Sequence, residues 1–271
     1  MNYDAQSFIQ MINKMNTITS NFYKDGYHIE KNIFPKKNIG VIENEFDYIV
    51  KQLKLSGENI NARWDSKLRS ALEQNKMDTE VIHTHNVQSY SAEMLFLLQD
   101  KKFLDVVESL IGQNIILHHT KLFLKPPKKG AAFPLHQDWS YFPTINNSMI
   151  AAVLHLSEST EKMGCLRIVP GSNKLGQIED TDGHSFIPKI HNKYKLEDAC
   201  PIIADPGDIV FFHSCSLHGS MPNFSNKPRK TILFQFYSGN DRVIDNNQHT
   251  NVQLVLRGRN QYASRNSVDN L

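Results

Sequence analysis

Three residues could together hold a divalent metal ion. His136 and Asp138 are two positions apart, and side chains two apart on a strand point to the same face. The third candidate is His218, which follows the apolar run 209–212. Two histidines and one carboxylate leave three positions of a metal open, an arrangement typical of non-haem Fe(II) oxygenases. A chelating 2-oxo acid can take two of these positions and O₂ the third.

A cation follows the third candidate ligand at a spacing that suits a co-substrate. Arg229 comes after His218 and the turn-like stretch 222–228, and we expect a hairpin to bring it alongside His218. Arginine can form two parallel bonds to a carboxylate and keeps its charge when buried. Ser220 is two residues after His218, so it faces the same side of an extended segment. These residues predict a site for the distal carboxylate of 2-oxoglutarate.

Each of these residues alone has a simpler explanation. A lone His-x-Asp is common by chance, a single histidine is more often hydrogen-bonded in a core, and an arginine is more often exposed. Their order along the chain favours the functional interpretation. His-x-Asp is followed by the Asp-Pro-Gly-Asp turn at 205–208, an apolar strand, His-Gly-Ser and then Arg.

Other histidines are weaker candidates. His83 and His85 have no carboxylate to complete a metal site, so we expect exposed loop residues or residues at a pocket mouth. His118 and His119 should point to opposite faces of a strand, so at most one of them could reach the site. His155 lies in an apolar strand and is expected to be a core histidine with its hydrogen bonds satisfied.

Lysines, a cysteine and aromatic residues also lie near the candidate ligands. Lys125, Lys128 and Lys129 could attract an anionic substrate, but such a cluster is more often solvated surface. Cys215 is expected to be a buried structural thiol. Aromatic side chains after the first ligands could form walls of a substrate pocket: Trp139, Tyr141 and Phe142.

The two halves of the chain have different apolar patterns. Apolar residues three and four apart predict amphipathic helices at 39–55, 91–98 and 102–111. From residue 115 onward, short apolar runs between Gly- and Pro-rich breaks predict strands at 115–117, 121–124, 149–156, 166–169, 209–212 and 231–237. Many short strands are typical of a β-sandwich or barrel. The polar stretch 177–199 has no clear period and is expected to be a long surface loop beside the site.

Composition excludes several classes of protein. The 271 residues include 30 basic and 28 acidic side chains, and this balance gives no general attraction to nucleic acid or membranes. Three cysteines do not form a disulfide framework. No secretory signal and no apolar run of membrane-spanning length is seen. We therefore expect a cytoplasmic protein whose partner is a small molecule.

Several segments resemble the phytanoyl-CoA dioxygenase family of Fe(II)/2-oxoglutarate oxygenases: residues 22–27, 125–127, 134–143, 164–174, 207–212, 218–220 and 229–230. The resemblance is specific over 121–237 and weaker elsewhere. It implies a double-stranded β-helix, or jelly roll, with N-terminal helices packed on one sheet. One domain would span 1–271, with a mostly helical part (1–114), a jelly-roll core (115–240) and a C-terminal extension (241–271).

The resemblance also implies roles for single residues. It makes His136, Asp138 and His218 the iron ligands and places Ser220 and Arg229 on 2-oxoglutarate. Lys121 and Leu154 fall where family members contribute walls to the co-substrate pocket.

The expected reaction is hydroxylation of an unactivated C–H bond in a small metabolite or natural-product intermediate, with Fe(II), 2-oxoglutarate and O₂ consumed to give succinate and CO₂. Asp138 argues against halogen transfer, because halogenases of this type replace the carboxylate to admit chloride. Desaturation and oxidative cyclisation use the same ligands and stay open. A non-catalytic metal-binding jelly roll would need neither Arg229 nor Ser220, and cupin-type metalloenzymes tend to use more histidine ligands. The lysines near residue 125 allow an anionic substrate without requiring one.

Overall fold

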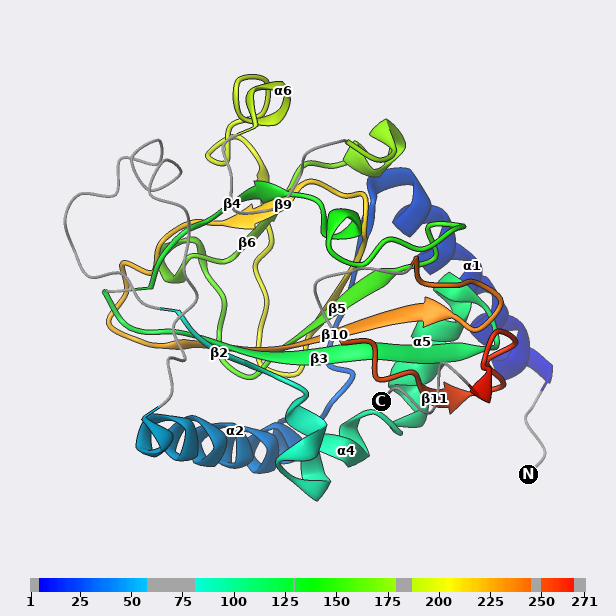
Figure 1. Ribbon diagram of the computed structural model, residues 1–271, viewed down its shortest axis with the longest axis horizontal. Coiled ribbons are helices and arrows are strands. Elements are labelled where there is room, and N and C mark those ends of the chain that lie inside the picture. The colour runs from blue at the N-terminus through cyan, green and yellow to red at the C-terminus, as the bar shows by residue number, and fades with distance from the viewer. Residues whose placement is uncertain (1–4, 58–80, 129, 179–186, 245–249, 266–271) are drawn as a thin grey trace.

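Two antiparallel β-sheets form the centre of the molecule (Figure 1). The computed structural model describes residues 5–57, 81–128, 130–178, 187–244 and 250–265. Within them, the larger sheet has the order β1 (Tyr27–Glu30), β8 (Ile209–His213), β5 (Ile150–His155), β10 (Arg229–Ser238), β3 (Ile115–Lys125) and β11 (Leu254–Arg257), and β2 (Ile82–His85) also pairs with β3. The smaller sheet has the order β4 (Phe133–His136), β9 (His218–Ser220), β6 (Leu166–Ile168) and β7 (Cys200–Pro201). The predicted jelly roll is confirmed.

Alternation along the strands separates two environments. In β10, Phe234 and Phe236 belong to the core on the helix side of the larger sheet. Leu233 belongs instead to a cluster between the sheets, together with Ile168 of β6. Since side chains alternate along a strand, the polar residues of β10 at positions 229, 231 and 235 also face the space between the sheets. The polar residues that could take part in chemistry therefore lie between the two sheets, and the apolar residues that pack against the helices lie on the outer face of the larger sheet.

Helices cover the outer face of the larger sheet (Figure 1): α1 (Ala5–Asp25), α2 (Lys36–Ser56), α4 (Ala92–Leu97) and α5 (Lys101–Ile111). The Asp100 carboxylate caps α5 by accepting a bond from the Phe103 backbone N–H at 2.9 Å. The Phe103 ring then packs on Phe211, Phe234 and Phe236, with centroids 6.0, 5.2 and 5.5 Å apart. Burial of each such ring contributes about 1.5–3 kcal/mol. The prediction of helices packed on one sheet is confirmed.

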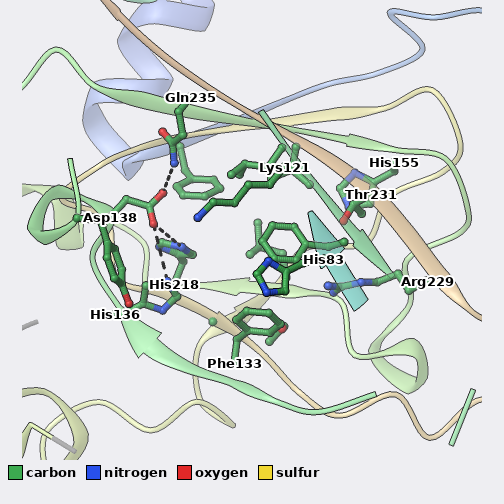
Figure 2. Close-up of a pocket in the computed structure, with 18 of the residues that line it drawn as sticks. His83, Lys121, Phe133, His136, Asp138, His155, His218, Arg229, Thr231 and Gln235 are labelled. Atoms are coloured by element: carbon green, nitrogen blue, oxygen red, sulfur yellow. Dashed lines mark hydrogen bonds and ion pairs between the residues drawn. The ribbon is translucent and has the colours of Figure 1, made fainter. Parts of the chain in front are cut away.

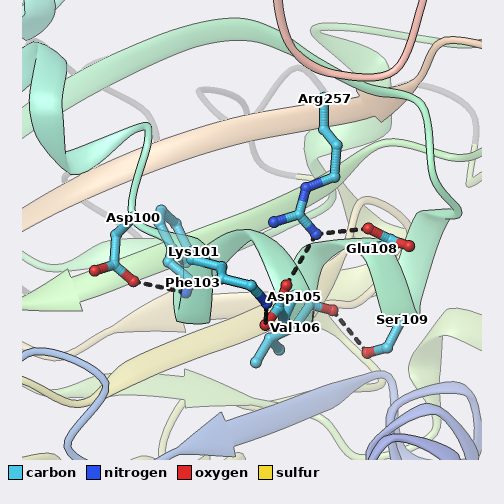
Figure 3. Close-up of polar contacts among 8 residues, drawn as sticks. All are labelled: Asp100, Lys101, Phe103, Asp105, Val106, Glu108, Ser109 and Arg257. Atoms are coloured by element: carbon cyan, nitrogen blue, oxygen red, sulfur yellow. Dashed lines mark hydrogen bonds and ion pairs between the residues drawn. The ribbon is translucent and has the colours of Figure 1, made fainter. Parts of the chain in front are cut away.

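Ion pairs of one arginine connect the C-terminal strand β11 to α5 (Figure 3). Arg257 Nη1 donates to Asp105 Oδ1 at 3.0 Å and to Glu108 Oε2 at 2.5 Å. These carboxylates raise the pKa of Arg257, although partial burial opposes them. Residues from the predicted C-terminal extension therefore complete the edge of the larger sheet.

Several elements differ from the predicted ones. Helix α1 was not predicted, because Asn13, Asn16, Thr17 and Thr19 have low helix propensity. The runs 115–117 and 121–124 form one strand, β3. Strands β1 and β2 come from the part expected to be mostly helical, and they join the larger sheet.

Short helical turns occupy several connections: η1 (Val87–Ser89), η2 (Asp138–Ser140), η3 (Glu161–Met163), η4 (Ser172–Leu175) and α6 (Pro188–His191). The last lies in the predicted surface loop 177–199, of which 179–186 are outside the described residues. Ile190 and Leu196 of this stretch are buried against Leu135 and Leu217, so its described part packs on the smaller sheet. Within the described ranges, none of the helices combines the length and apolar character that crossing a lipid bilayer requires.

Candidate metal and co-substrate site

Local backbone geometry brings the three predicted ligands together. His136 lies directly opposite His218 in the β4–β9 pair, so both imidazoles project from one face. Gln137 is still extended, with φ −113° and ψ 139°, and its side chain turns away and donates to the Cys215 carbonyl oxygen at 2.6 Å. Asp138, the first residue of η2, returns to the histidine face. The strand itself ends at His136, but the extended residue 137 preserves the predicted alternation.

The donor atoms fit a divalent metal ion. His136 Nδ1 lies 2.8 Å from the Pro134 carbonyl oxygen, and His218 Nδ1 lies 3.0 Å from the Ser216 carbonyl oxygen. With Nδ1–H donating to these carbonyls, each Nε2 keeps its lone pair, and the two Nε2 atoms lie 3.8 and 3.6 Å from Asp138 Oδ1. One ligand atom of each residue lies within 4.8 Å of the others, and no second group of this kind occurs in the described ranges.

A glutamine side chain orients the carboxylate of Asp138. Gln235 Nε2 donates to Asp138 Oδ2 at 2.6 Å, as Figure 2 shows. The bond occupies one carboxylate oxygen and leaves Oδ1 toward the two imidazoles. Such hydrogen bonds to ligands orient them and raise metal affinity. The sequence did not single out Gln235, although its position six residues after Arg229 gives it the same face of β10.

A cavity of about 350 Å³ extends from this group between the two sheets. The metal-ligand group lies at one side of it and Arg229 at the other (Figure 2). Phe123, Phe133, Phe212 and Leu233 provide apolar walls. A cavity with apolar walls and a few convergent polar groups is typical of a small-molecule site.

Arg229 is a buried cation without a carboxylate partner among the described residues. Its Nη1 donates to the Gly164 carbonyl oxygen. Burial lowers the pKa of Arg229 to about 10, so it stays charged at neutral pH. The predicted hairpin is wrong, because β9 and β10 lie in different sheets. Arg229 enters the cavity from the sheet opposite His218, with Thr231 and His155 beside it (Figure 2).

Ser220 lines the cavity as predicted. Its hydrogen-bond partner is Lys125, one of the three lysines for which a solvated position was expected. Lys125 Nζ donates to Ser220 Oγ at 2.7 Å, and Lys125 is fully buried, so the interpretation of the cluster as solvated surface is wrong for this residue. Lys128 is exposed. Residue 129 lies outside the described residues. The sequence carries no signal for the burial of Lys125 beyond its place in the segment 125–127.

Of the two residues predicted to form walls of the co-substrate pocket, Lys121 lines the cavity and Leu154 does not. Lys121 lines the cavity, with Nζ 5.5 Å from the centroid of the Phe142 ring. Burial lowers the pKa of Lys121 to about 8, although the nearby Asp138 raises it. Leu154 belongs to the core on the helix side, and its neighbours Val153 and His155 line the cavity in its place. The prediction for Leu154 is therefore wrong, because alternation along β5 points it away.

The remaining histidines occupy a second group near the cavity. His83 and His85 line it from β2, which fits the pocket-mouth alternative. His118 and His119 do not face opposite sides: their Nδ1 atoms lie 2.7 Å apart, and both rings pack on Phe142. In the β3–β10 register Gln235 pairs with His119 and Phe236 with Leu117, so His118 is an extra, bulged residue of β3. This bulge breaks the strand alternation on which the prediction rested. Neither of them lines the cavity.

His155 is a cavity residue with an unsatisfied nitrogen. It is buried, and its Nδ1 has no hydrogen-bond partner among the described residues, so the expected satisfied core histidine is wrong in that respect. Burial, helped by the charge of Arg229, lowers the pKa of His155 to about 3. It is therefore neutral near pH 7.

The other side chains near the ligands follow the expectations more closely. Cys215 is buried, and burial raises the pKa of its thiol to about 11, which fits a structural thiol. Tyr141 and Phe142 line the cavity, whereas Trp139 does not.

Known proteins resemble the chain in sequence and in fold. A family model described as phytanoyl-CoA dioxygenase matches residues 22–231. The chain belongs to the phytanoyl-CoA dioxygenase family. Human peroxisomal phytanoyl-CoA dioxygenase is 30% identical over 244 residues, which cover 83% of this chain and 69% of that protein. A probable alpha-ketoglutarate-dependent hypophosphite dioxygenase of Stutzerimonas stutzeri is 29% identical over 196 residues, covering 69% of this chain and 67% of that protein.

The fold comparison agrees with the family. The epimerase SnoN, solved with Fe³⁺, alpha-ketoglutarate and nogalamycin RO, superimposes with a TM-score of 0.71 at 18% identity, covering 91% of this chain and all of that one. Family membership and the His-Asp-His group together make this member of the phytanoyl-CoA dioxygenase family an Fe(II)- and 2-oxoglutarate-dependent dioxygenase.

Proposed function

We propose that the enzyme hydroxylates a C–H bond of a small anionic molecule, with His136, Asp138 and His218 binding iron and Arg229 binding the distal carboxylate of 2-oxoglutarate. One observation carries the proposal: a single cavity joins the three ligands to a buried arginine that has no carboxylate partner among the described residues. Burying an isolated cation is costly, and a bound carboxylate offsets that cost. A metal-binding jelly roll without a 2-oxo acid would not need this arginine.

The residues of the site bind the metal and the co-substrate, orient them and keep water away from them. When bound, Fe(II) and 2-oxoglutarate together supply the oxidation of substrate by O₂. Gln235 keeps one oxygen of Asp138 occupied and so presents the other to the metal. The Gly164 carbonyl holds one nitrogen of Arg229, which leaves the rest of the planar guanidinium for the co-substrate. Phe133, Phe212 and Leu233 exclude water from the space between.

Charge balance supports an anionic substrate. Among the described residues that line the cavity, Arg229 and Lys121 are cations and Asp138 is the single carboxylate. A divalent metal adds two positive charges and 2-oxoglutarate two negative charges, so one positive charge stays uncompensated. An anion would offset it. Hypophosphite, the substrate in the name of the Stutzerimonas stutzeri relative, is an anion.

Formation of succinate from 2-oxoglutarate tests this function. The protein with Fe(II), O₂ and 2-oxoglutarate is offered pairs of small compounds of matched size, one a carboxylate or phosphonate and the other a neutral alcohol or amide. We expect anionic members to stimulate succinate formation, and Asp138→Ala and His218→Ala to abolish it. Equal stimulation by neutral members contradicts the substrate class, and undiminished turnover in His218→Ala contradicts the site.

Product analysis separates hydroxylation from its alternatives. A gain of one oxygen atom in the product supports hydroxylation, whereas loss of two hydrogens without added oxygen indicates desaturation or cyclisation. The cytoplasmic location expected from the sequence stays a prediction.

A further inference from the structure

Lys125 is a buried basic side chain beside the proposed co-substrate site. It is fully buried, and no carboxylate of the described residues pairs with it. Its pKa is well below the ordinary lysine value, because burial and the charge of Arg229 both disfavour its protonated form. Buried lysines without a counter-ion are rare in folded proteins, so this one calls for a function.

The contacts of Lys125 lead to the cavity. Its Nζ donates to Ser220 Oγ at 2.7 Å and to the Met221 carbonyl oxygen at 2.7 Å, and it lies 5.2 Å from the centroid of the Phe133 ring. Lys125 itself does not line the cavity, but Ser220 and Phe133 do. Any effect of Lys125 on a ligand must therefore pass through Ser220, through Phe133 or through the electrostatic field of its amino group. Of these, only Ser220 has a polar atom that can bond a carboxylate.

Backbone pairing holds Lys125 next to Arg229. The two residues are direct partners in the antiparallel β3–β10 register, so their side chains leave the sheet on the same face. The Asn223 side chain donates to the Lys125 carbonyl oxygen at 3.2 Å and to the Lys227 carbonyl oxygen at 2.8 Å. It thereby connects the turn before Arg229 to the end of β3. The position of the Lys125 amino group is thus fixed by the strands and not by chance packing.

We propose that Lys125 is a positioning residue for the co-substrate: it fixes the Ser220 hydroxyl so that its proton points at the distal carboxylate held by Arg229. The inference rests on the proposed function. A hydroxyl oxygen that accepts a bond from the lysine Nζ must direct its own hydrogen elsewhere, and the open side of Ser220 is the cavity. Accepting that bond also makes the hydroxyl a stronger donor. Lys125 and Arg229 together then favour a dicarboxylate over a 2-oxo acid with a neutral end.

The experiment compares two 2-oxo acids of equal length. Calorimetry with the Mn(II)-loaded protein measures the Kd of 2-oxoglutarate and of 2-oxopentanoate, which lacks the distal carboxylate. We expect Lys125→Met to weaken 2-oxoglutarate binding about tenfold or more and to leave 2-oxopentanoate binding unchanged. Lys128→Met, which removes an exposed lysine three residues away, serves as the matched control and should leave both unchanged.

A double-variant cycle tests the route through Ser220. We expect Ser220→Ala to lower the preference for 2-oxoglutarate as well, and the double variant to lose little more than the stronger single variant. A merely structural lysine would affect both 2-oxo acids alike. Equal loss of both ligands in Lys125→Met, or an unchanged preference in Ser220→Ala, overturns the inference. The test with Ser220→Ala remains decisive even if Lys125→Met does not fold. Absence of 2-oxoglutarate binding by the unaltered protein would instead contradict the proposed function.

Discussion

Single hydrogen bonds decide which atoms of the site remain available to ligands. Gln235 occupies one oxygen of Asp138, and backbone carbonyls accept from the Nδ1 atoms of His136 and His218. Removing any of these bonds leaves a donor atom free to turn away from the metal. Metal affinity is therefore the quantity that the residues around the ligands control.

Replacing Gln235 with leucine tests this control. Gln235→Leu keeps similar bulk but removes the donor to Asp138 Oδ2, so we expect the affinity for Mn(II) or Fe(II) to fall by about 10- to 100-fold. Competition with a chelating dye measures it. Gln113→Leu makes the same chemical change at an exposed position and should have no effect. An unchanged metal affinity in Gln235→Leu contradicts the role of the bond.

At the scale of single residues, the sequence was most informative where function depends on spacing. His136, Asp138 and His218 could be predicted because their order and spacing are visible in the chain. Lys125 could not, since nothing in a sequence says that a lysine in a loop-like cluster is buried. Leu154 was placed on the wrong wall because a single position along β5 reverses the direction of a side chain.

The tight turn at Gly164 helps to position Arg229. Gly164 ends η3 with φ 66° and ψ 55°, and its carbonyl oxygen accepts from Arg229. A Cβ built on Gly164 would overlap the Met221 carbonyl oxygen and lie 2.7 Å from the Pro222 carbonyl oxygen. The positive φ and the close backbone approach both require glycine here.

Replacing that glycine should affect stability and co-substrate binding together. We expect Gly164→Ala to destabilise the fold by more than the ~1–2 kcal/mol that a left-handed residue alone costs, and to weaken 2-oxoglutarate binding. Gly171→Ala is the matched control: φ is 73°, and its Cβ would meet only the Lys24 carbonyl oxygen at 3.8 Å. Urea unfolding and calorimetry measure the two effects. Equal losses in the two variants contradict the steric account.

The tie between β11 and α5 gives a second prediction at this scale (Figure 3). Arg257 and its partners are partly exposed, and such ion pairs contribute up to about 1 kcal/mol each. We expect Arg257→Met to lower the free energy of unfolding by about 1 kcal/mol, and less at high salt, without changing 2-oxoglutarate binding. Arg242→Met alters an exposed arginine and should leave stability unchanged. A loss that does not respond to salt contradicts an electrostatic tie.

Elements were predictable where one face of a helix or strand is apolar. The pattern in α5 and in β5, β8 and β10 was visible for that reason, and their bounds lie within two residues of the predicted ones. The pairing of strands was not visible. Nothing local says that β9 and β10 enter different sheets, or that β1 and β2 leave the helical part to join the larger sheet.

The whole molecule encloses its chemistry between two sheets, and this burial makes its stability depend on pH. Burial holds the pKa of His155 at about 3, below the ordinary value of 6.5. Above pH 6.5 both the folded and the unfolded chain have a neutral imidazole. Between pH 6.5 and 3 the unfolded chain binds a proton that the folded chain excludes, so the folded state loses stability as the pH falls.

Urea unfolding of the metal-free protein at several pH values measures this loss. Relative to His155→Leu, the unaltered protein should lose up to about 1.4 kcal/mol more per pH unit below pH 6.5. Titrating groups that do not interact with His155 are common to both proteins and cancel in the comparison. Parallel pH profiles for the two proteins contradict the neutral, buried His155.

We propose that one cavity holds a metal ion on His136, Asp138 and His218, and 2-oxoglutarate between that metal and Arg229. Calorimetric titration of 2-oxoglutarate into the protein with and without Mn(II), and into His218→Ala with Mn(II), tests it most directly. We expect one 2-oxoglutarate to bind per chain when the metal and all three ligands are present, and binding to be much weaker when the metal or one ligand is missing. No binding to the Mn(II)-loaded protein, or equal binding with and without metal, would contradict it.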